Sequence, residues 1–200
     1  MNIFELTDHI HTNEGAIQFL RDRGVLRSLN HPPLCDVCGQ AMQEARRKNT
    51  RGDSVHWLCR RKFAGRRHKR TQSIRHGSFL KNSNLELKRF ILLAYTWAHG
   101  FSNTAQETMI GLTDKPVTQW NQWFRNICSQ HLLNNNNPIR LGGVGSSGIC
   151  GPTVDIHGIR VNMLDSYKDE VQWRQLYGKK TVKAFDNLLH HISIYFPVNN

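Results

Sequence analysis

The chain is 200 residues long, with 38% hydrophobic and 21% charged residues, which excludes a fully disordered chain and allows one domain or a few small modules. Its formal net charge of +12 predicts a polyanionic partner. No apolar run reaches the ~20 residues of a membrane-spanning helix and no signal peptide is evident, so we expect an intracellular protein with reduced cysteines and no membrane segment.

Residues 1–33 are predicted to form a helical N-terminal segment. The apolar side chains of residues 13–27 fall on one helical face, and Gly24 is expected to end that helix. The sequence NHPP then breaks the chain before the first cysteine.

Residues 34–79 predict a basic, zinc-ribbon-like module. Residues 46–75 hold twelve of the 27 Lys and Arg residues and one acid, Asp53, a net charge of +11; the other 170 residues hold 15 positive and 14 negative charges. Because cations that neutralise phosphates release counterions, this concentration favours a nucleic-acid partner. A solvated basic face or a nuclear import signal is the alternative. The predicted phosphate contacts are Arg60, Arg61, Lys62, Arg66, Arg67, Lys69, Arg70 and Arg75.

The cysteines of this module predict a metal site. Cys35 and Cys38 are two residues apart and a glycine follows, a spacing that turns both sulfurs toward one ion. Cys59 is the third ligand at a separation typical of a ribbon. Two histidines compete for the fourth position, His56 and His68. A segment so poor in aliphatic residues needs a cross-link such as a bound metal ion to fold. The alternative is three buried free thiols and a disordered basic tail.

Residues 80–133 predict three consecutive helices. Residues 85–98 carry apolar side chains at a helical period, and SNTAQETMIG follows with a capping residue at its start and a glycine at its end. The tight turn before the third helix, which has Pro116 in its first turn, predicts a helix-turn-helix. Its buried stripe is expected at Val117, Trp120, Phe124, Ile127 and Leu132. Its exposed, base-reading face is expected at Thr118, Gln119, Asn121, Gln122 and Arg125, unless these residues merely solvate an amphipathic helix.

The last third of the chain is less regular. Residues 134–162 predict a linker, a Gly-rich loop and one strand at 153–161. Residues 163–200 predict two helices, at 164–178 and 180–196. Their apolar side chains are expected either to pair as a helical hairpin or to form a patch that dimerises the chain. These are Trp173, Phe185, Leu188, Leu189, Ile192 and Phe196.

Several stretches, taken in order, resemble the Merlin superfamily of DDE transposases of eukaryotic DNA transposons, which are related to bacterial insertion-sequence transposases. They are AIQFLRDRGVL, CDVCG with HWLC, SIRHGSF, LLAYTWAHGFS, VTQWNQWFRNIC, IRLGGVG and LDSYKDEVQWR. The resemblance implies a ribbon and helix-turn-helix that bind transposon ends, and a ribonuclease-H-like core with three acids around two metal ions. It also implies a fourth zinc ligand just upstream of the SIR segment, which favours His68.

The catalytic core that the resemblance implies is incomplete in this sequence. Asp155 matches the glutamate of the first catalytic motif, but His157 stands where a metal-binding aspartate belongs, and Mg²⁺ prefers oxygen ligands. LDSYKDEVQWR, which follows the third acid in the family, begins shortly afterwards, so the strands carrying the other two acids are missing. Asp165, Asp169 and Glu170 match a non-catalytic helix and are expected on its solvated side, with Trp173 facing inward.

We therefore predict a mainly α fold with a small β module: a zinc ribbon, a helix-turn-helix, a remnant strand of a ribonuclease-H-like core and a C-terminal helical pair. The predicted function is nuclear binding of double-stranded DNA of the transposon-end type by a transposase-derived protein that holds Zn²⁺ and has no catalytic residues. The alternatives are a zinc-containing protein-interaction adaptor, a non-functional transposase remnant, and a fragment of an active DDE transposase.

Overall fold

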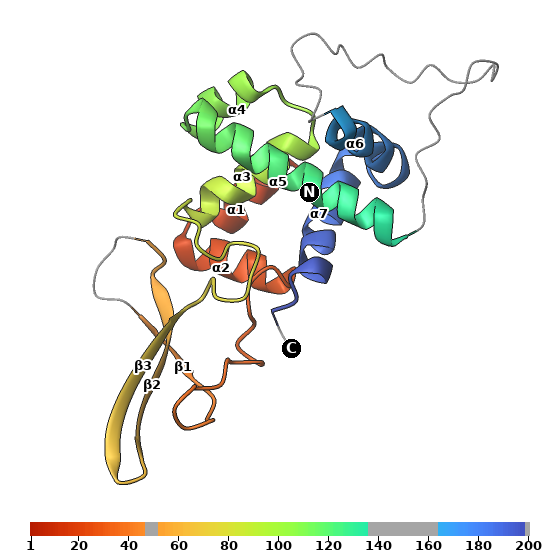
Figure 1. Ribbon diagram of the computed structural model, residues 1–200. Coiled ribbons are helices and arrows are strands. Elements are labelled where there is room, and N and C mark those ends of the chain that lie inside the picture. The colour runs from red at the N-terminus through yellow and green to blue at the C-terminus, as the bar shows by residue number, and fades with distance from the viewer. Residues whose placement is uncertain (47–51, 136–163, 199–200) are drawn as a thin grey trace, which may run out of the picture.

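The computed structural model describes residues 1–46, 52–135 and 164–198, which form seven helices and one three-stranded antiparallel sheet (Figure 1). The helices are α1 (Ile3–Ile10), α2 (Asn13–Asp22), α3 (Leu87–Ala98), α4 (Asn103–Ile110), α5 (Asp114–Asn134), α6 (Leu164–Tyr177) and α7 (Thr181–Tyr195). The strands are β1 (Gln43–Arg46), β2 (Val55–Phe63) and β3 (Arg66–Ser73). The predicted class, mainly α with a small β module, is confirmed. The strand predicted at 153–161 lies outside the described residues.

The helices form one body built around α3. This helix contacts α2, α4, α5 and α7, and a single cluster of buried side chains extends from Leu6 on α1 to Ile192 on α7. Phe90 of α3 and Phe124 of α5 are fully buried at its centre. The apolar stripe predicted for α5 is buried as expected.

The helix boundaries follow local signals in the sequence. The Ser102 hydroxyl accepts a hydrogen bond from the backbone N–H of Ala105 at the start of α4, and Gly111 ends this helix with φ +69°, a left-handed conformation that glycine adopts without strain. Only the two residues Leu112 and Thr113 then lead to α5. Helix α1 lies within the predicted helical segment 1–33, but only the helix in residues 13–27 was predicted there individually, although a capping box between Asn2 and Glu5 marks the start of α1.

The C-terminal helices pair with each other, as one of the two predicted arrangements has it: the Trp173 indole N–H of α6 donates to His191 of α7 (3.0 Å). They also pack on the other helices, which was not predicted. Helix α6 packs on α5, and α7 packs on α3 and α5. Trp173 and Leu188 are fully buried, whereas Phe196 is 37% exposed and its ring contacts that of Phe79. The apolar positions were predicted correctly, but the surface that covers them was not.

The sheet is attached to the helical body at its inner end and projects from it at the outer end (Figure 1). Arg21 of α2 pairs with Glu44 of β1 and lies over the ring of Trp57 on β2. β2 alternates buried and half-buried residues from Val55 to Cys59 and is exposed from there to its end. The outer part of the hairpin β2–β3 therefore has no hydrophobic core of its own. None of the described helices is long and apolar enough to cross a membrane.

Candidate functional site

The first two cysteines lie in a turn whose backbone holds both sulfurs on one side. The Gly39 N–H donates to the Cys35 carbonyl (2.8 Å), and the Cys35 N–H donates to the Gln40 carbonyl (2.9 Å). Gly39 has φ +67°, which explains the glycine after the second cysteine. This turn is the predicted knuckle.

The other two members of the cluster come from the hairpin. Cys59 lies on β2 directly opposite Arg70 of β3, and His68 is two residues before Arg70. Directly opposed residues of an antiparallel pair share a face, and alternate residues of one strand do as well, so Cys59 and His68 are diagonal neighbours on one face. The two-residue turn Ala64–Gly65 brings them together; both residues have positive φ (47° and 79°), as the favoured two-residue hairpin turn requires.

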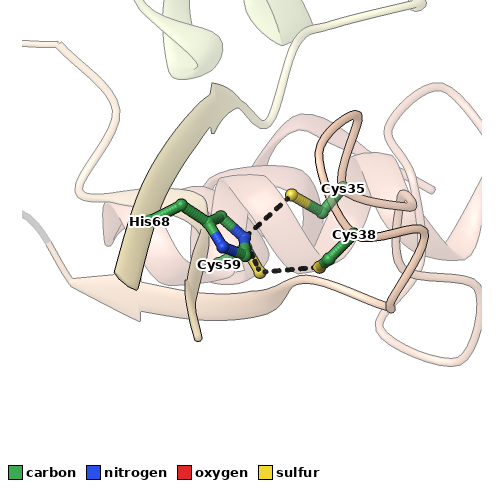
Figure 2. Close-up of side chains that lie close together, drawn as sticks. All are labelled: Cys35, Cys38, Cys59 and His68. Carbon is green, nitrogen blue, oxygen red and sulfur yellow. Dashed lines mark hydrogen bonds between the residues drawn. The ribbon is translucent and has the colours of Figure 1, made fainter. Parts of the chain in front are cut away.

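The four side chains point toward one another (Figure 2). Their ligand atoms all lie within 4.8 Å of one another. The separations are 3.7 Å for Cys38 Sγ to Cys59 Sγ, 3.6 Å for Cys35 Sγ to His68 Nε2 and 3.4 Å for Cys59 Sγ to His68 Nε2. A tetrahedral ion with metal–sulfur and metal–nitrogen bonds of about 2.3 and 2.0 Å requires about 3.8 Å between sulfurs and about 3.5 Å between sulfur and nitrogen. These three separations match such a site, so the four side chains could hold one metal ion.

The thiols in this cluster differ in acidity. Burial raises the pKa of Cys35, but hydrogen bonds from the backbone N–H groups of Val37 and Cys38, with contributions from His68 and Cys59, outweigh burial and lower this pKa to about 7. Burial, followed by the hydrogen bonds to Cys38 and Cys35, raises the pKa of Cys59 to about 11. A bound cation must displace these protons, so its affinity falls as the solution is acidified.

The fourth member of the cluster is His68, and His56 is not part of it. His56 is three residues before Cys59 on the same strand, and an odd separation places the two side chains on opposite faces of a strand. Val55, Trp57 and Cys59 form the buried face, and His56 is on the other. His68 presents Nε2 to the sulfurs.

The predicted phosphate contacts on the hairpin are exposed and fall on both of its faces. Arg61, Arg66 and Arg70 share the face of the metal cluster; Arg70 pairs with Asp36 (3.5 Å) and Arg61 donates to the Ala41 carbonyl (3.3 Å). The opposite face carries two directly opposed cation pairs. They are Arg60 with Lys69, and Lys62 with Arg67.

Within the described residues, none of these four cations has an ion pair or a side-chain hydrogen bond. Directly opposed like charges destabilise a sheet. No acidic residue occurs anywhere between Asp53 and Glu86. This face therefore carries uncompensated positive charge, and we call it the basic face of the hairpin.

Arg75 is not a surface contact, which corrects the prediction. Its guanidinium donates to both carboxylate oxygens of Asp53 (2.6 and 2.8 Å) and to the carbonyls of Ser83 (3.0 Å) and Leu85 (2.7 Å). Both charged side chains are buried, at 9% and 11% exposure. Arg75 thus connects the end of β3 to the segment that precedes α3. The sequence signal for this pair was Asp53 itself, the lone acid in a strongly basic segment.

The base-reading face predicted on α5 is only partly exposed. Asn121 is buried and donates to Asn103 (2.8 Å) and Gln106 (2.9 Å) of α4. Arg125 is buried as well, near Glu170 and over the ring of Tyr167 on α6. The prediction that these two residues face solvent is wrong, because their polar partners come from neighbouring helices.

The other three residues of that face have mixed surroundings. The Thr118 hydroxyl donates to Asp114 (2.9 Å) and accepts from Asn103 (3.1 Å). Gln122 is half-buried and bonded to Asn126 and Arg125. Gln119 is exposed. Helix α4 contains no Lys or Arg, so the helix pair α4–α5 lacks the concentrated positive charge of the hairpin.

The acids of α6 are not equivalent. Asp165 is exposed as expected, and Trp173 is buried as expected. Glu170 is only 15% exposed and pairs with Arg174 (2.8 Å) and Arg125 (4.0 Å), so the expectation that it is solvated is wrong. Asp155 and His157 lie outside the described residues.

Of the other cysteines, Cys128 is fully buried in α5, and burial raises its pKa. Comparison with protein-family models, curated proteins and solved structures finds no match to this chain.

Proposed function

We propose that this chain binds double-stranded DNA through the hairpin β2–β3, and that a Zn²⁺ ion held by Cys35, Cys38, Cys59 and His68 anchors this hairpin. The observation that carries the proposal is the basic face, where four cations oppose one another and none of them forms an ion pair within the described residues. Repulsion between these cations destabilises the free hairpin, and binding of DNA phosphates would relieve that repulsion.

The donor set supports zinc as a structural ion. Three sulfurs and one imidazole nitrogen suit Zn²⁺, and four protein ligands leave no open position for a substrate. The site lies at the base of the free part of the hairpin, beyond which β2 and β3 have no buried side chains. An isolated two-stranded hairpin is marginally stable in water, so zinc would keep the basic face in place.

Transposase ancestry is part of the proposal and rests on the stretches quoted above. It implies a DNA partner of the transposon-end type and, with the basic segment, a nuclear location. We propose binding without strand cleavage, because His157 replaces a metal-binding acid of the family motif. Cleavage of such DNA by the purified chain with Mg²⁺ would instead indicate a fragment of an active transposase.

The experiment is a titration of a DNA duplex with the zinc-loaded chain at several salt concentrations. The slope of log affinity against log salt is about −0.9 for each phosphate neutralised. A variant in which Arg60, Lys62, Arg67 and Lys69 are replaced by Gln should therefore lose about 3.6 units of slope. The matched control replaces four exposed lysines outside the hairpin, Lys81, Lys179, Lys180 and Lys183, by Gln.

Both variants have the same net charge, so a general effect of charge reduces both slopes equally. The proposal predicts a large loss for the hairpin variant alone. Equal slopes for the two variants, or a wild-type slope shallower than about −3, would contradict it.

A further inference from the structure

The tip of the hairpin carries an exposed aromatic side chain. Phe63 is the last residue of β2, directly opposite Arg66, and the two-residue turn Ala64–Gly65 follows it. Its side chain is 51% exposed, and within the described residues it makes no ring contact. An apolar ring at this position contributes nothing to the hydrophobic core.

The tip is distant from the rest of the molecule. Phe63 is four residues beyond Cys59, which corresponds to about 13 Å along a strand. Every residue from Arg60 to Arg67 is exposed, and the ribbon projects away from the helices (Figure 1). The hairpin therefore forms a free arm with an aromatic end.

Positive charge surrounds this ring on both faces of the arm. Arg61 and Arg66 share the face of Phe63, and Lys62 and Arg67 lie on the basic face. A ribbon that lies flat on a duplex needs cations on one face only. Cations on both faces match the two rows of phosphates that border a groove, with the tip directed at the base pairs between them.

We propose that Phe63 is a wedge that stacks on a base at a weakly stacked step, so that the arm prefers duplexes that are bent or locally unpaired. Apolar side chains inserted between base steps unstack and bend duplexes, and a mismatched or unpaired base is the easiest to unstack. This inference rests on the proposed function and names the form of DNA that the same surface selects.

The test uses the zinc-loaded full chain and two duplexes that differ by one central mismatched pair, with a fluorophore on each end to report bending. The wild type should bind the mismatched duplex about 5- to 150-fold more tightly than the matched one, the range expected for one base–aromatic stack. Phe63→Ala should lose this preference and the bending, and Phe63→Trp should retain both.

The matched control is Phe4→Ala, since Phe4 is 78% exposed on α1; it should behave as the wild type does. Neither alanine variant should change zinc content or the salt slope. A wild type that does not discriminate between the duplexes, or a Phe63→Ala variant that still does, overturns the wedge and leaves the proposed function standing. Absence of binding to both duplexes at low salt overturns the proposed function, and the wedge with it.

Discussion

Replacing Arg75 separates a structural role from a DNA-contacting role. Arg75→Ala would leave the Asp53 carboxylate buried without its partner and remove the donors to two backbone carbonyls. Breaking a buried ion pair by removing one member costs about 3–5 kcal/mol. For a chain of this length the melting temperature should fall by about 6–20 °C. The salt slope of DNA binding should not change, because Arg75 does not reach the surface.

The assay is chemical denaturation of the zinc-saturated chain. Arg60→Ala removes an exposed arginine of the basic face and serves as the control; it should change the unfolding free energy by less than about 0.5 kcal/mol. If Arg75→Ala does not fold, the double variant Arg75→Met with Asp53→Leu should recover part of the loss, because no unpaired charge remains buried. A loss below about 1 kcal/mol for Arg75→Ala, or a shallower salt slope with unchanged stability, would refute the structural role.

Three further outcomes follow from the buried polar groups and the metal cluster. Burial, together with the neighbouring His131 and His190, lowers the pKa of His191 to about 4, so the unfolded chain binds this proton below about pH 6.5 and the folded chain does not. The contribution of His191 to stability is therefore constant above that pH and should fall by about 2 kcal/mol between pH 7 and 5. His191→Phe should remove this part of the loss, and an unchanged loss in that variant would contradict the assignment. Arg125→Gln should lower the unfolding free energy by about 1–3 kcal/mol and leave duplex affinity unchanged. A loss of duplex affinity without a loss of stability would show instead that Arg125 contacts DNA. Cys59→Ser should abolish stoichiometric zinc measured by metal analysis, while Cys128→Ser should retain it; zinc retained at full affinity by the first variant would exclude Cys59 as a ligand.

The metal cluster was largely predictable because its determinants are local. The spacing of Cys35, Cys38 and Gly39 indicates a knuckle in any fold. The choice between His56 and His68 depends on which residues form a strand, since an odd separation from Cys59 excludes His56 only if the intervening residues are extended. The turn Ala64–Gly65 that brings His68 back has no strong sequence signature, so spacing alone could not decide.

The errors on α5 and α6 have one physical cause. Asn121, Arg125 and Glu170 are polar, and an amphipathic pattern assigns polar residues to solvent. Each of them instead has polar partners on a neighbouring helix, and no local pattern shows which helices will meet. The same holds for Arg75, whose partner Asp53 is 22 residues away in the sequence. The positions of α2 to α7 were therefore predictable, and the buried polar contacts between helices were not.

The most direct test of the account is the salt dependence of duplex binding by the zinc-loaded chain, repeated after removal of the metal and again after its return. We expect a slope of log affinity on log salt of about −3.6 or steeper, loss of binding at physiological salt on chelation, and recovery with one equivalent of zinc. Equal affinity with and without the ion, or a slope shallower than about −3, would contradict a metal-anchored basic hairpin.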